Sequence, residues 1–107
     1  MYIAIVQIPG ISRTKEKAMA DAGTTIEKFS KVDGLLKKYF LNGDAGGGGV
    51  YIWESKEAAD KWYTKAWEEA NVKRFGVKPV LTCYDNYVFL DNQNGKVSFD
   101  GLVQDIA

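Results

Sequence analysis

The sequence has no histidine, one cysteine and two prolines in 107 residues. The absence of histidine excludes a Ser/His/Asp or Cys/His catalytic arrangement, a His-ligated haem, and the usual zinc and non-haem iron sites. Cys83 cannot form an internal disulfide, and no cationic neighbour in the sequence would activate its thiol. We therefore expect Cys83 to be a small buried apolar residue, and we expect no metal cofactor.

The sequence also has no net charge, because 14 Lys and Arg balance 14 Asp and Glu. No cluster of arginines is visible, so nucleic acid is not an expected partner. The N-terminal run MYIAIVQIPG has no basic leader, and its apolar stretch is too short for a signal peptide or a membrane span. We expect a cytoplasmic protein without a membrane partner.

Hydrophobic residues make up 46% of the chain and charged residues 26%, as in an ordinary globular protein. A chain of this length is expected to form one domain with a thin core. We predict a single domain over residues 1–107, with a core over 1–91 and a C-terminal arm over 92–107.

The first part of the chain predicts a strand, a helix and a strand. Tyr2–Pro9 is apolar on both alternations except for Gln7, which indicates a strand buried on both faces. Apolar residues at spacings of three and four predict a helix over Arg13–Lys31, with a weak spot at residues 23–25. Leu35–Asn42 is rich in aromatic and aliphatic residues and predicts the next strand.

The middle of the chain is glycine-rich and then strongly helical. Residues 42–49 (NGDAGGGG) predict a flexible hairpin loop or, alternatively, a gate over a ligand mouth. Val50–Trp53 predicts a strand, and Lys56–Arg74 predicts one amphipathic helix capped by Ser55.

The last part predicts a long strand over Val80–Leu90, a turn over Asp91–Gly95 and a short returning strand over Lys96–Phe99. The residues after Gly101 are too few to pack alone. The order of elements is thus strand, helix, strand, strand, helix, strand, followed by a hairpin arm.

This order predicts an α+β protein with the ferredoxin-like βαββαβ antiparallel sheet and two helices on one face. Two helices can cover only one face of a four-stranded sheet, whereas the strands are apolar on both faces. We therefore expect a homodimer that packs sheet on sheet, as in the dimeric α+β barrel.

Several short motifs make the chain resemble the YdhR-like mono-oxygenase family over about residues 2–92. They are Gly34-Leu35-Leu36 followed by Lys38, Gly48-Gly49-Val50-Tyr51-Ile52-Trp53 closing on Ser55, Ala58-Ala59 with Trp62-Tyr63, and Phe75-Gly76 before Pro79. The resemblance implies a reaction of an electron-rich aromatic or polyketide-like substrate with dioxygen, without metal or flavin. It places the pocket between the helices and the sheet.

Such an enzyme has to exclude water, hold the substrate ring and stabilise an oxidisable anion. The candidate catalytic residues are Trp67, Lys38 and Gln7. Aromatic side chains from the same elements are the candidate substrate-binding residues: Tyr39, Tyr51, Trp53, Trp62, Tyr63 and Tyr84.

Each candidate also has a purely structural interpretation. The aromatic residues at helical spacing fit a plain core, Lys38 fits an edge strand with its ammonium in water, and Gln7 fits a side chain that satisfies a backbone group. The alternative functions are a non-catalytic dimer that binds an apolar ligand or belongs to a larger assembly, and a lactone isomerase. The isomerase would need Asp85, Glu54 or a lysine of lowered pKa as its base.

Overall fold

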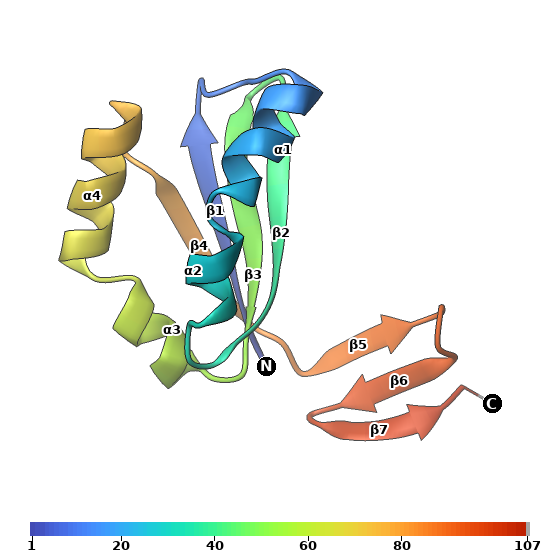
Figure 1. Ribbon diagram of the computed structural model, residues 1–107. Helices are drawn as coiled ribbons and strands as arrows, with labels where there is room; N and C mark the ends of the chain where they lie inside the picture. Colours follow the sequence, from blue (N-terminus) through green and yellow to red (C-terminus); the bar gives the residue numbers. More distant parts are fainter. Residues whose placement is uncertain (107) are drawn as a thin grey trace.

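The computed structural model describes residues 1–106, which form an α+β fold with two antiparallel sheets (Figure 1). The four-stranded sheet has the order β2-β3-β1-β4. Its strands are β1 (Tyr2–Pro9), β2 (Leu35–Gly43), β3 (Gly46–Trp53) and β4 (Val80–Asp85). This order of antiparallel strands is compatible with a ferredoxin-like fold, and the predicted strand over Tyr2–Pro9 is confirmed.

Four helices lie on one face of this sheet (Figure 1): α1 (Lys15–Gly23), α2 (Ile26–Ser30), α3 (Lys56–Trp62) and α4 (Lys65–Phe75). The predicted weak spot at residues 23–25 is confirmed, since α1 and α2 are separate helices there. The hydroxyl groups of Thr24 and Thr25 donate to the carbonyls of Asp21 and Ala22, which ends α1.

The prediction of one continuous helix over Lys56–Arg74 is wrong. Tyr63 leaves helical geometry with φ −85° and ψ 72°, so α3 ends before it. The hydroxyl of Thr64 then accepts a hydrogen bond from the backbone N–H of Trp67 and caps a new helix. The apolar periodicity continues across this break, which is why the sequence pattern did not reveal it.

The prediction of a hairpin loop over residues 42–49 is right in the hairpin that joins β2 to β3 but wrong in its extent, because the turn is confined to Asp44 and Ala45. Gly46–Gly49 belong to β3, where Gly48 pairs with Gln7 and Gly46 pairs with Pro9 of β1. Gly48 has φ +135°, and a Cβ there would overlap the Val6 carbonyl oxygen. Only glycine adopts this backbone without strain, so the glycines permit the close approach of β3 to β1.

The predicted strand Val80–Leu90 is two strands that belong to different sheets. β4 ends at Asp85, and Asn86 donates its backbone N–H to the carbonyl of Met1. The chain then enters a three-stranded sheet of β5 (Val88–Asp91), β6 (Lys96–Phe99) and β7 (Leu102–Asp105), which extends away from the rest of the molecule (Figure 1). The predicted C-terminal arm over 92–107 is therefore part of a small sheet that begins at Val88, and Leu102–Asp105 form its third strand. We call this sheet of β5, β6 and β7 the arm.

The core lies between the helices and the four-stranded sheet. Its buried residues come mainly from alternate positions of β1 and β3: Ala4, Val6, Ile8, Tyr51 and Trp53, with Ala59 of α3 packed against them. Cys83 of β4 is half-buried beside this cluster. The alternation of side chains places the other set of strand residues on the opposite face, where no helix of the described chain covers them (Figure 1).

Candidate functional site

A cavity of about 450 Å³ lies between the helices and the four-stranded sheet. β1, β2 and β3 form one side of it, and residues of α1, α2, α3 and α4 form the other. Binding sites for small organic ligands commonly have volumes of a few hundred Å³. The chain therefore leaves room for a ligand in front of its buried core.

The walls of the cavity are rich in aromatic rings. The ring centroid of Phe29 lies 5.7 Å from that of Trp62 and 6.1 Å from that of Tyr51, in tilted and edge-to-face arrangements. Rings arranged in this way present both faces and edges to a flat ligand. The aromatic lining residues are Phe29, Phe40, Tyr51, Trp62, Trp67 and Phe75.

The glycines of β3 open the floor of the cavity. Gly47 and Gly48 line it without side chains. At the neighbouring Gly49, a Cβ would come within 3.2 Å of both the Lys38 side chain and the Tyr51 ring. The glycine-rich strand therefore supplies the space that Lys38 occupies.

Lys38 of β2 extends into this aromatic region. Its Nζ lies 3.5 Å from the ring centroid of Phe29, 4.0 Å from that of Phe40 and 4.7 Å from that of Tyr51. Burial, together with the positive charges of Lys28 and Arg74, lowers the pKa of Lys38 to about 7. The three ring faces attract the ammonium form, so both protonation states are accessible near neutral pH.

Lys28 of α2 and Arg74 of α4 are exposed residues that also line the cavity. The Nζ of Lys28 lies 5.3 Å from the Phe29 ring and 5.5 Å from the Trp62 ring. Among residues 1–106, none of Lys28, Lys38 and Arg74 forms a salt bridge with a carboxylate. These three cations thus give this part of the cavity an uncompensated positive charge.

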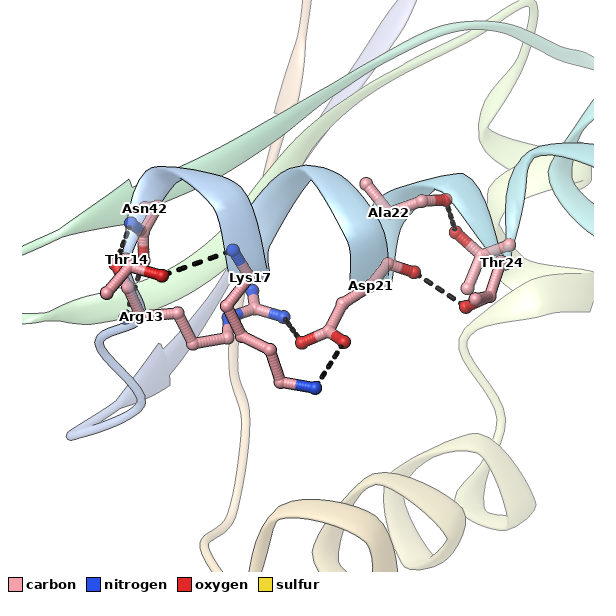
Figure 2. A network of polar contacts seen from close by, with 8 residues as sticks. Arg13, Thr14, Lys17, Asp21, Ala22, Thr24 and Asn42 are labelled. Atoms are coloured by element: carbon pink, nitrogen blue, oxygen red, sulfur yellow. Dashed lines mark hydrogen bonds and ion pairs between the residues drawn. The ribbon is translucent and has the colours of Figure 1, made fainter.

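Asp21 is the one carboxylate on the cavity wall within the described chain, and its charge is already compensated. Arg13 Nη1 and Lys17 Nζ each lie 2.9 Å from a different oxygen of Asp21. Figure 2 shows both side chains pointing to this carboxylate. Both hydrogen bonds lower the pKa of Asp21. The Asn42 amide in turn donates to the carbonyl of Arg13, which ties this network to β2.

A second aromatic layer lies behind the cavity. Trp53 is fully buried and donates its indole N–H to the hydroxyl oxygen of Tyr63 at 3.2 Å. Burial raises the pKa of Tyr63 and raises the pKa of Tyr51 to about 12, so both phenols are neutral at physiological pH. Trp53 and Tyr63 support the cavity wall through packing, and neither Tyr63 nor the cavity-lining Tyr51 is a proton-transfer group near pH 7.

The structure brings together four of the residues that the sequence marked as candidates: Lys38, Tyr51, Trp62 and Trp67 line the cavity. Trp53 and Tyr63 lie in the layer behind it. The other three candidates lie on the opposite face of the sheet and are exposed: Gln7, Tyr39 and Tyr84. Side chains alternate between the two faces of a strand, and each of these residues is adjacent in sequence to a helix-facing one. Gln7 pairs with Gly48 and cannot point to the same side as Val6 and Ile8.

Sequence reasoning missed Phe29, Lys28, Arg74 and Phe75 as members of the site. The helix predicted over Arg13–Lys31 includes Phe29, and the helix predicted over Lys56–Arg74 ends at Arg74, but neither pattern indicates a site. Their convergence depends on how α2 and α4 pack over β2 and β3, for which one sequence contains no direct signal.

No group of three or more acidic, histidine or cysteine residues within residues 1–106 could hold a metal ion. No helix of this part of the chain is long and apolar enough to cross a bilayer.

No protein-family model matches the chain, and no curated protein shows significant similarity to it.

Proposed function

We propose that the protein is a cofactor-independent mono-oxygenase that oxidises a small aromatic or polyketide-like compound in this cavity. The observation that carries the proposal is a lysine of pKa about 7 facing three aromatic rings beside empty space for a ligand. A plain aromatic core would fill that space with its own side chains.

The chemistry requires a base and then a cation at the same place. The neutral amine of Lys38 takes the proton of a phenol or enol, and the ammonium so formed stabilises the resulting oxyanion. The electron-rich anion passes an electron to dioxygen, and the two radicals combine at carbon to form a peroxide anion. This anion takes the proton back from the Lys38 ammonium and becomes a hydroperoxide. For a CH2 group between two rings, loss of water leaves a ketone, with one oxygen atom in the product and the other in the water.

The aromatic residues exclude water and orient the substrate. Trp62 and Trp67 come from α3 and α4, and Phe29 comes from α2, so three helices hold the ring against the sheet. A dry, shaped site strengthens the attraction between the Lys38 ammonium and the substrate oxyanion.

The proposal includes a two-fold homodimer. The face of the four-stranded sheet away from the helices carries exposed apolar side chains, among them Tyr39, Val80 and Tyr84. One face of the arm is also apolar and exposed, with Val88, Leu90, Phe99 and Leu102 on the same side of its sheet. A second copy of the chain that packs against both surfaces would bury them from water.

A second candidate is an isomerase that moves a proton within an unsaturated lactone. Lys38 favours it, because an amine of pKa about 7 is suited to remove a proton from carbon and return it at another position. This reaction needs no oxidant, so it proceeds equally under nitrogen.

Oxygen uptake with a panel of hydroxyanthrones tests the proposal. The wild-type protein should consume oxygen, Trp67→Ala should lose most of the activity, and Lys38→Met should lose about 100-fold. Lys37→Met, on the opposite side of the same strand, should retain it. No oxygen uptake by the wild-type protein across the panel contradicts the proposal, and an anaerobic shift of a lactone double bond would favour the isomerase.

A further inference from the structure

We infer that the cavity recognises a planar aromatic anion, held through its carboxylate, sulfonate or phenolate oxygens by the cluster of Lys28, Lys38 and Arg74. The inference narrows the substrate class of the proposed function, on which it rests for its biological meaning. Its physical test is binding, so it can be checked whether or not the protein turns a substrate over.

The distribution of charge is the first argument. Four cationic side chains line the cavity, whereas the one carboxylate on its wall in the described chain, Asp21, is held by Arg13 and Lys17. The remaining cations come from three separate elements, α2, β2 and α4. Like charges that converge on one cavity repel one another, and an anionic ligand removes that repulsion.

A buried donor without an acceptor is the second argument. The indole Nε1 of Trp62 is buried and has no hydrogen-bond partner within residues 1–106. Trp62 lines the cavity, and its ring lies against both Phe29 and Lys28. An unsatisfied buried N–H is costly, and the oxygen of a bound anion would satisfy it.

The arrangement of the rings is the third argument. The ammonium groups of Lys28 and Lys38 both lie near the ring of Phe29. A flat ligand that stacks among these rings therefore brings a substituent at its edge close to both cations. Inorganic anions lack the ring and would gain only the charge interaction.

The affinity for an anion of fixed charge should fall as the pH rises above about 7, because Lys38 then loses its proton in the free protein. The charged and titratable groups around Lys38 are Lys28 of α2, Arg74 of α4 and Tyr51 of β3, with the Arg13–Asp21 pair farther along the wall. Tyr51, with its pKa raised to about 12, remains neutral over this range.

The experiment compares naphthalene-2-sulfonate with naphthalene-2-sulfonamide, which has the same rings and no charge. Isothermal titration of the wild-type protein at pH 6.5 should give about tenfold or greater preference for the sulfonate. The Trp62 indole N–H signal in a ¹⁵N-correlated NMR spectrum should shift with the sulfonate. Sodium sulfate should bind more weakly than the naphthalene compound.

Variants separate recognition from folding. Lys38→Met and Arg74→Met should each reduce sulfonate affinity about tenfold and change sulfonamide affinity little. Their matched controls, Lys37→Met on the same strand and Lys73→Met on the same helix, should bind the sulfonate like the wild type.

Equal affinity for the two naphthalene compounds, or equal losses in the control variants, would overturn the inference. Preference for the sulfonate without any oxygen uptake would contradict the mono-oxygenase and support anion recognition. Oxygen uptake without that preference would support the mono-oxygenase and contradict anion recognition.

Discussion

The ammonium nitrogen of Lys38 lies 3.5 Å from the centroid of the Phe29 ring, which joins β2 to α2 through a cation–π contact. This contact places a titratable cation in the aromatic wall of the cavity. Burial of the Lys38 ammonium among these rings should lower the unfolding free energy of the protein when no ligand is bound.

Lys38→Met should therefore stabilise the free protein at low pH. Burial lowers the pKa of Lys38 from 10.5 to about 7, so between these values the unfolded chain holds a proton that the folded chain has lost. Wild-type stability rises with pH across this interval, and below pH 7 the full penalty applies. Urea unfolding at pH 6 should show the variant more stable by about 1 kcal/mol, because solvent and the ring faces offset part of the cost.

The difference in unfolding free energy between Lys38→Met and the wild type should shrink as the pH rises from 7 towards 10. Lys37→Met serves as the control, since its side chain lies on the other face of the sheet. Identical pH dependence of the two variants would contradict the placement of Lys38.

Gly48→Ala should be severely destabilising. The added Cβ would overlap the Val6 carbonyl oxygen, and alanine disfavours the φ of +135° found there. We expect a loss of about 3 kcal/mol or more in urea unfolding, or failure to fold. Gly43→Ala is the control, because its nearest neighbouring atom would be 3.9 Å away, and unchanged stability of both variants would show that β3 does not pair with β1 as described.

Tyr63→Phe should leave the indole N–H of Trp53 without its acceptor. Because Trp53 is fully buried, the loss should cost about 1–3 kcal/mol of unfolding free energy. Tyr87→Phe, at a tyrosine 63% exposed, should be nearly neutral in the same thermal or chemical melt. Equal effects of the two substitutions would argue against the hydrogen bond.

Leu102→Glu should separate the proposed homodimer into single copies. Leu102 is 71% exposed on the apolar face of the arm, and a carboxylate buried there against a partner would lack a counter-charge. Light scattering should report twice the chain mass for the wild type and one chain mass for the variant. Met19→Glu is the matched control and should remain a dimer, because Met19 is exposed on α1, on the helical side of the sheet. A wild-type protein with the mass of one chain would refute the homodimer.

The local patterns of the sequence predicted the first strand, the interruption in the first helix and the antiparallel α+β class. Helical spacing also placed Trp62 and Trp67 on one apolar face, whereas Tyr51 was a candidate through the motif that carries the family resemblance. Gly46–Gly49 escaped prediction, since glycine composition favours loops and only the pairing with β1 makes these residues a strand.

The rest of the site depends on contacts between distant segments. Lys28 and Arg74 are ordinary surface residues in sequence, and they share a cavity with the candidate Lys38 because two helices pack over one sheet. Residue type alone was also misleading for three candidates, Gln7, Tyr39 and Tyr84. Their side chains could serve in a site, but the strand register places them on the face of the sheet away from the helices.

Isotope analysis of a hydroxyanthrone incubated with the protein under ¹⁸O₂ tests whether the protein is a mono-oxygenase. We expect one ¹⁸O atom in the new carbonyl group and one in water, at a rate well above that without protein and strongly reduced in Lys38→Met. Incorporation no faster than in buffer, while the compound is shown by NMR to occupy the cavity beside Trp62, would contradict it.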